Sequence, residues 1–199
     1  MLYPKSLEDA INSFKKLPGV GEKSAERYAL SLLDLDEKEI DEFSKSVKEV
    51  KDNIKTCKVC GHLTDKDTCA ICSDKNRNDN LICVVEDYKS VFMFEKTGTF
   101  NGKYHVLNGL INPTEGIMPE DINISGLVDR IGDNASDVEL IIALKPTIEG
   151  ETTTLYIKKI FEKKNVKVSR LSYGIPIGVD IDYLDSLTLD RALIDRKEI

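Results

Sequence analysis

The chain has 199 residues, enough for one large domain or two to three small ones, and its 41% hydrophobic content can fill a core. No apolar run approaches the ~20 residues that a membrane helix needs, and 32% of the residues are charged, so neither a span nor a lipid anchor is indicated. The net charge of −7 excludes a protein that coats nucleic acid with its whole surface, because phosphate binding gains its affinity from released counterions.

Two short helices around a glycine turn are predicted at the N-terminus. Ser6 and Asp9 have the spacing of a capping box, and apolar residues recur at helical spacing from there up to Pro18. Residues 17–21 read L-P-G-V-G, which predicts a bend. A second helix is predicted from Glu22, so the first fifty residues should contain a helical hairpin.

A third helix is predicted from Asp36, because Glu39 follows three residues later, as in a capping box. Its apolar positions keep a three-and-four spacing and are Ile40, Phe43, Val47, Val50 and Ile54. This helix is expected to end where a group of cysteines begins.

The cysteines Cys57, Cys60, Cys69 and Cys72 follow the pattern C-x2-C-x8-C-x2-C, the spacing of two knuckles that place four thiolates around one zinc ion. Four thiolates leave no position for water, so the metal is expected to be structural. Gly61 permits a tight turn that aims backbone N–H groups at sulfur. The module is expected to fold only with metal, and a chelator should loosen it first.

Two disulfides in a secreted protein are the alternative interpretation of these cysteines. The first five residues, M-L-Y-P-K, lack the continuous apolar run of a signal peptide, which favours zinc and a cytosolic protein. The fifth cysteine, Cys83, lies within an apolar segment and is expected to be buried. His62 and His105 are expected to be structural, since the thiolates already complete the metal site.

From residue 81 onward, strands alternate with helices, which predicts an α/β domain with a mostly parallel sheet. The predicted strands span residues 81–85, 104–107, 138–144 and 166–171, and the predicted helices span residues 126–131 and 152–164. Residues 74–80, D-K-N-R-N-D-N, are predicted to be the linker before this domain.

The glycine turn of the hairpin suits a phosphate. Gly19 and Gly21 let the backbone approach a ligand closely, and the next helix presents free N–H groups and its positive dipole end. Lys23 and Arg27 are four residues apart, so both can flank one phosphodiester run. A plain hairpin whose charges pair in water is the alternative, and spacing alone does not decide between the two.

An ATP site is not expected. Residues 19–24, G-V-G-E-K-S, lack P-loop spacing and put Glu22 where the cradle glycine belongs. Residues 178–185 look like a Walker B strand that ends in acid, but without a matching P-loop they imply no ATPase.

Six motifs follow one another in a recognisable order. They are L-P-G-V-G-x-K-S-A-x-R, C-x2-C-x8-C-x2-C, V-V-E-D, Y-H-V-L-N-G with P-x-E-G-I, P-T-I-E-G-E, and Y-L-D-S-L-T-L-x-R-A-L. In this order they closely resemble the RecR family, the bacterial recombination mediators, and the resemblance runs essentially from end to end.

The resemblance implies a multidomain α+β chain. The expected parts are a helix-hairpin-helix domain (residues 1–55), a four-cysteine zinc finger (56–73), a Toprim domain (79–172) and a C-terminal Walker B-like segment (173–199) that packs on a neighbouring subunit. Such a family forms rings, so a ring-shaped tetramer is expected, with the hairpins lining it and Lys23 and Arg27 at the DNA.

Carboxylates are expected to gather at one edge of the Toprim sheet, where Glu86 follows the first strand and Glu149 and Glu151 follow the third. Toprim enzymes hold magnesium there with a Glu and an Asp-x-Asp pair. Here the pair is Glu-Gly-Glu, and the positive charge of Lys145 would compete with a magnesium ion. Magnesium binding is therefore possible at these carboxylates but is not expected. In RecR-like proteins this surface is where RecO docks, which makes the three carboxylates candidates for partner contact.

The implied function is that of a non-enzymatic, DNA-binding mediator of recombinational DNA repair. With RecO and RecF it would help load RecA on gapped or single-stranded DNA coated by single-strand-binding protein, and double-stranded DNA is a further expected ligand. The expected location is the cytoplasm, at the nucleoid. The alternative is a magnesium-dependent Toprim nuclease or primase-like phosphotransfer enzyme.

Overall fold

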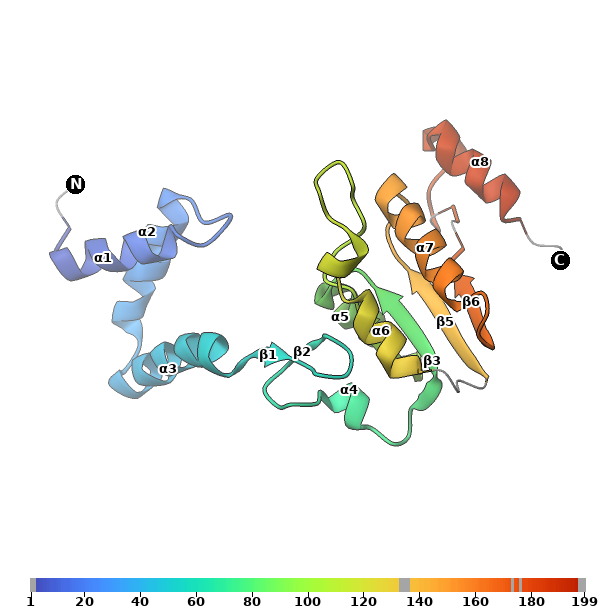
Figure 1. Ribbon diagram of the computed structural model, residues 1–199. Coiled ribbons are helices and arrows are strands. Elements are labelled where there is room, and N and C mark those ends of the chain that lie inside the picture. The colour runs from blue at the N-terminus through green and yellow to red at the C-terminus, as the bar shows by residue number, and fades with distance from the viewer. Residues whose placement is uncertain (1–2, 133–136, 173, 176, 197–199) are drawn as a thin grey trace. The chain divides into compact units, whose positions relative to one another are not determined.

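A computed structural model describes residues 3–132, 137–172, 174–175 and 177–196 (Figure 1). The chain divides into two compact units, residues 1–54 and residues 55–199. No helix among the described residues is both long enough and apolar enough to cross a membrane.

The first unit is helical, as predicted. It contains α1 (Lys5–Phe14), α2 (Glu22–Ser31), a short 3-10 helix (Leu32–Asp34) and α3 (Glu37–Asn53). Ile11 of α1 packs against Ala25 and Ala29 of α2, which closes the hairpin. The predicted capping box of α1 is wrong: the helix begins after Pro4, no side chain caps it, and Asp9 pairs with Lys5 at 2.8 Å instead.

The capping box of α3 is confirmed. The carboxylate of Asp36 accepts a hydrogen bond from the Glu39 N–H at 2.9 Å, and the Glu39 carboxylate accepts one from the Asp36 N–H at 2.9 Å. The apolar side of this helix is largely exposed in the described unit, at Phe43, Val47, Val50 and, beyond the last turn, Ile54.

The second unit begins with the four-cysteine module. Two short strands, β1 (Lys55–Thr56) and β2 (Leu63–Thr64), pair antiparallel and are followed by the single turn α4 (Ala70–Ser73). The backbone N–H of Val106, which lies in the large sheet of this unit, donates to the carbonyl of Cys60 at 2.7 Å. The module is therefore joined to that sheet.

The large sheet has the order β4-β3-β5-β6, and each neighbouring pair is parallel. This confirms the predicted α/β domain. The strands are β3 (Asn78–Val85), β4 (Gly102–Val106), β5 (Val138–Ala143) and β6 (Val166–Arg170), and the helices are α5 (Tyr88–Thr97), α6 (Ile124–Ile131) and α7 (Ile148–Phe161). A 3-10 turn (Pro119–Asp121) precedes α6.

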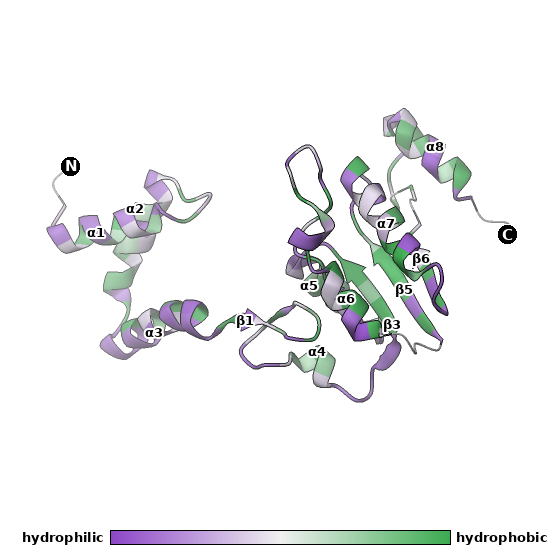
Figure 2. Cartoon of the chain, in the orientation of Figure 1, coloured by the Kyte–Doolittle hydropathy of each residue, from purple (hydrophilic) through white to green (hydrophobic). Residues whose placement is uncertain are grey.

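Helices cover both faces of this sheet. Ile82 and Val84 of β3 belong to the core that α6 and α7 complete, whereas Cys83 and Val85 face the smaller core under α5. Because the central strands are covered on both faces, residues 81–85 of β3 and most of β5 are hydrophobic (Figure 2). The first three residues of β3, 78–80, are polar and exposed. The prediction that Cys83 is a buried apolar residue is confirmed.

Two sequence predictions about connecting segments are wrong. Residues 74–80 are not a free linker: β3 already starts at Asn78, and the Arg77 guanidinium forms hydrogen bonds of 2.9 and 2.6 Å with the Glu95 carboxylate. Residues 178–185 form no Walker B strand but a turn and a 3-10 helix (Ile181–Tyr183). Asp185 then caps α8 (Ser186–Ile194) by accepting a hydrogen bond from the Thr188 N–H.

Candidate functional site

The four cysteines form a compact metal site. All four Sγ atoms lie within 4.8 Å of one another, and those of Cys60 and Cys69 are 3.6 Å apart. A zinc ion with Zn–S bonds of about 2.3 Å needs sulfur–sulfur distances of roughly 3.8 Å, so the arrangement fits a tetrahedral ion. Cys57, Cys60 and Cys69 are buried and Cys72 is partly buried. The site suits one structural zinc per chain.

Backbone N–H groups support the sulfur ligands. The N–H of Cys69 donates to Cys57 Sγ at 3.3 Å, and the N–H of Cys72 donates to Cys69 Sγ at 3.4 Å. Gly61 takes the left-handed conformation that the turn needs (φ 74°), and its own N–H donates to the Cys57 carbonyl. The backbone N–H of His62, the next residue, bonds to the Cys60 sulfur, as the turn was expected to allow.

The glycine turn of the hairpin is open on its outer side. Gly19 has a positive φ of 80°, and a Cβ placed on either Gly19 or Gly21 would have no heavy atom within 4 Å. Gly21 is the N-cap of α2 and has no side chain to bond the first N–H groups of the helix. These groups can therefore receive an external acceptor.

The cations of α2 lie on its exposed side. Lys23 and Arg27 are exposed, whereas Ala25 and Ala29 are buried against α1. Neither cation forms an ion pair with a described residue, although the Arg27 guanidinium lies 5.4 Å from the centre of the Tyr28 ring.

The neighbouring acid of the hairpin is already engaged. The Glu22 carboxylate pairs with the Lys15 ammonium at 3.1 Å, so its charge is partly neutralised at the start of α2. The alternative of a hairpin whose charges pair among themselves thus describes Lys15 and Glu22, but not Lys23 and Arg27.

At the Toprim edge, Glu86 follows β3 and Lys145 follows the adjacent parallel strand β5. The Lys145 ammonium lies 2.8 Å from the Glu86 carboxylate, and this hydrogen bond raises the pKa of Lys145. Glu149 lies in the first turn of α7, where its own backbone N–H and the Thr147 hydroxyl lower its pKa. Glu86 and Glu149 therefore have different partners.

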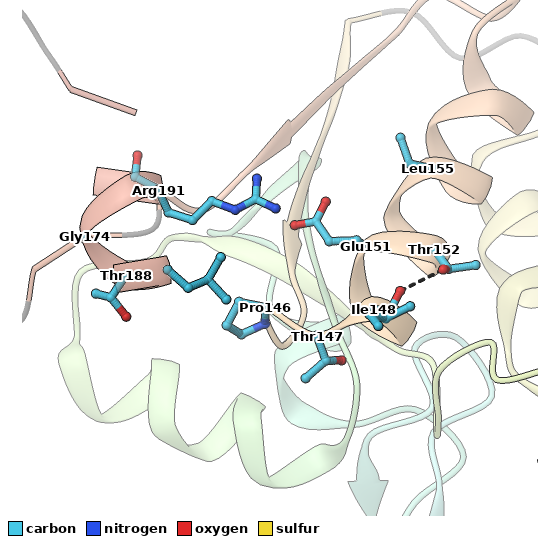
Figure 3. A pocket seen from close by; sticks show the side chains of 11 residues that line it. Pro146, Thr147, Ile148, Glu151, Thr152, Leu155, Gly174, Thr188 and Arg191 are labelled. Carbon is cyan, nitrogen blue, oxygen red and sulfur yellow. Dashed lines mark hydrogen bonds between the residues drawn. The ribbon is translucent and has the colours of Figure 1, made fainter. Parts of the chain in front are cut away.

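The third carboxylate, that of Glu151, faces residues of β6 and α8, which come later in the chain. Arg170, the last residue of β6, donates to the Glu151 carboxylate at 2.9 Å and also lies 3.5 Å from the Asp195 carboxylate. Figure 3 shows the Arg191 side chain of α8 pointing toward the same Glu151 carboxylate. Within the described parts of the chain, the cysteines are the one group of three or more potential ligands close enough to share an ion.

Glu151 also borders a pocket of about 620 Å³ between the start of α7 and α8 (Figure 3). Apolar side chains of Ile148, Leu155 and Leu187 line it beside Arg191. The sequence did not identify Arg170 or Arg191 as partners of the acidic edge, because nothing local in the sequence links them to Glu151.

Gly150 shapes this edge for a steric reason. It is buried between Glu149 and Glu151, and a Cβ at this position would collide with the backbone carbonyl of Lys145. The Glu-Gly-Glu motif therefore needs its glycine so that the first turn of α7 can approach the end of β5.

Comparison with known families gives four matches in succession along the chain. Residues 7–51 match the RecR helix-hairpin-helix, and residues 54–74 match the RecR four-cysteine zinc finger domain. Residues 80–172 match the Toprim domain, and residues 174–197 match the RecR C-terminal region. The order agrees with that of the six sequence motifs.

Proposed function

The chain belongs to the RecR family of recombination-repair mediators, and from this premise we propose that it binds DNA through its hairpin and leaves the covalent bonds of the DNA unchanged. The proposed contacts are the backbone at Gly19 and Gly21 and the side chains of Lys23 and Arg27.

One observation carries the DNA-binding proposal. Lys23 and Arg27 extend from the exposed side of α2 without an acidic partner among the described residues, next to a helix N-terminus that no side chain caps. Two free cations beside unsatisfied N–H groups form a phosphate-binding surface. A local surface of this kind reconciles DNA binding with a net charge of −7.

The non-enzymatic part of the proposal is supported by the partners of the Toprim carboxylates. A catalytic magnesium ion is bound by one or two carboxylates together with water and substrate phosphate oxygens, so those carboxylates must be available to it. Glu86 pairs with Lys145, and Glu151 pairs with Arg170, so a cation would have to displace two protein cations. The alternative function is that of a magnesium-dependent nuclease or primase-like enzyme. The observation that supports this alternative is the match to the Toprim domain.

The proposed protein partners follow from the family and fit the exposed surfaces. RecO would dock at the acidic edge of Glu86, Glu149 and Glu151, beside the apolar pocket under α8. RecF would be a further partner, and together they would help load RecA on gapped or single-stranded DNA coated by single-strand-binding protein. The proposed location of this RecA loading is the cytoplasm, at the nucleoid.

A ring-shaped tetramer is the proposed assembly. Each unit of the chain has its own exposed apolar surface: Phe43, Val47 and Val50 on α3 in the first unit, and Leu187 and Leu193 on α8 in the second. Two separate interfaces per chain are what a closed dimer of dimers requires.

The mediator proposal is tested by the rate at which RecA replaces single-strand-binding protein on gapped DNA. Addition of this protein with RecO should accelerate the exchange and leave the DNA intact. Nicking or primer synthesis that requires magnesium and disappears in Glu86→Gln would instead establish the enzyme.

A further inference from the structure

Lys103 is a buried lysine at the junction between the zinc module and the Toprim sheet. Its side chain is 2% exposed, and its Nζ donates to three backbone carbonyls: those of Ile71 (2.9 Å), Cys72 (3.0 Å) and Asp74 (2.7 Å). An ammonium group has three N–H donors, so all three are used. The Asp79 carboxylate lies 3.4 Å away but is itself 84% exposed.

The three acceptors belong to the segment that carries the second zinc knuckle. Ile71 and Cys72 lie in α4, and its last carbonyls have no partner within so short a helix. A buried ammonium is stable only if hydrogen bonds replace its water, so the carbonyls and Lys103 fix one another. The peptide group of the ligand Cys72 is thereby fixed to β4.

The charge of Lys103 also matches that of the metal site. Zinc with four thiolates carries a net charge of about −2. Lys103 bonds to the backbone of one of these ligands from a buried position, where solvent screens charges less than at the surface. The positive charge of Lys103 is thus opposite in sign to that of the zinc-loaded site, which it contacts through the Cys72 carbonyl.

The first knuckle contacts the same strand through its backbone. Val106 donates its N–H to the Cys60 carbonyl at 2.7 Å, and a Cβ at Gly61 would lie 2.9 Å from the Val106 carbonyl oxygen. β4 is an edge strand of the sheet, so one strand holds both knuckles.

We propose that Lys103 is a positioning residue for the zinc ion: through its ammonium group, the Toprim domain holds the second knuckle in ligating geometry and controls how firmly zinc is retained. The zinc finger is then not an independent module, because part of its metal-site support comes from β4 of the next domain.

The test compares zinc release from the full-length, zinc-loaded protein into an excess of a chromogenic chelator. Lys103→Met keeps the apolar stem but removes the charge and the three hydrogen bonds. Loss of outer-shell support commonly costs about 10- to 100-fold in metal affinity, so release should accelerate by about that factor. The visible spectrum of cobalt(II) at the four cysteines should also change in this variant, because the ligand geometry relaxes.

Arg77→Met is the matched control. It removes the contacts of Arg77 with Glu95 and with the Gly102 carbonyl (3.2 Å), which join the same segment to the Toprim domain without touching a cysteine. It should lower thermal stability and leave zinc release near the wild-type rate. Equal release from Lys103→Met and wild type, or equally fast release from both variants, would overturn the proposal.

A measurement on the unmodified chain covers the case in which Lys103→Met does not fold. Amine acylation followed by mass spectrometry should leave Lys103 unmodified in the zinc-loaded protein and modify it after chelation. Protection that is unchanged by zinc removal would contradict the proposal, because a residue that stabilises the zinc site must itself be stabilised by zinc.

Discussion

The ammonium of Lys145 lies 2.8 Å from the carboxylate of Glu86, at the end of two adjacent parallel strands. A Toprim enzyme would hold magnesium at this edge, whereas here a side chain of the protein supplies the positive charge. The Toprim fold is therefore compatible with the non-enzymatic function proposed above.

Removal of Lys145 should make the edge more attractive to a divalent cation. We expect Lys145→Met to raise Mn²⁺ affinity by only about two- to five-fold, because exposed ion pairs are weak. Electron paramagnetic resonance of added Mn²⁺ measures the change. Lys89→Met, at an exposed lysine in the first turn of α5, is the control, and a gain that persists in Lys145→Met with Glu86→Gln would contradict this explanation.

Gly21→Ser should separate stability from DNA binding. Serine is a better N-cap than glycine, and the added Cβ meets no heavy atom within 4 Å, so the free energy of unfolding should be unchanged or rise by a few tenths of a kcal/mol. DNA affinity should fall, because the new side chain occupies the place of the phosphate. Urea unfolding and fluorescence anisotropy measure the two effects, and unchanged affinity would show that phosphate does not approach Gly21.

Gly150→Ala should destabilise the Toprim unit, because the new methyl group collides with the Lys145 carbonyl. Overpacking of this kind costs about 1–3 kcal/mol of unfolding free energy, measurable by urea denaturation. Gly174→Ala is the control, since a Cβ there meets nothing within 4 Å. Equal stability of both variants would mean that α7 can shift away from β5 at no cost.

Acid should destabilise the fold through His105. This residue is fully buried, its Nε2 bonds to the Asn123 carbonyl at 2.7 Å, and burial lowers its pKa from 6.5 to about 4. Between these values the unfolded chain binds the proton more readily than the folded chain. Stability should therefore be complete above pH 6.5 and fall by about 3 kcal/mol as the pH drops toward 4.

His105→Gln provides the control for this pH dependence, since an amide can keep the hydrogen bond to Asn123 without titrating. Protonation of the zinc ligands acts in both proteins, so the difference between the two stability curves isolates the histidine. Parallel curves from pH 7 to 4 would exclude His105 as the cause.

The parts of the structure that the sequence predicted depend on local signals. Asp36 and Glu39 are three residues apart and cap α3 within one turn. The two C-x2-C pairs each bring two sulfur atoms together locally, so the spacing of the four cysteines was enough to predict the metal site. The apolar runs of β3 and β5 are recognisable in the sequence because they lie in the covered centre of the sheet, where β3 is buried at residues 82–85 and β5 alternates between buried and partly buried residues.

The parts that the sequence did not predict depend on contacts between distant residues. Arg77 and Asn78 look like linker residues, because their partners Glu95 and Asn101 come much later in the chain. The sequence did not single out Lys103, because the carbonyls that bond its buried ammonium lie about thirty residues upstream. The partners of Glu151 likewise come from β6 and α8.

The central claim is that Lys23 and Arg27 bind the DNA backbone, and the salt dependence of DNA affinity tests it most directly. The full-length, zinc-loaded protein with Lys23→Ala and Arg27→Ala is compared with a control that carries Lys38→Ala and Lys45→Ala on α3. The first variant should lose affinity for single-stranded and gapped DNA, and its slope of log affinity against log salt should become shallower by about one unit per lysine or arginine removed. The same affinity and slope in both variants and the wild type would contradict the claim.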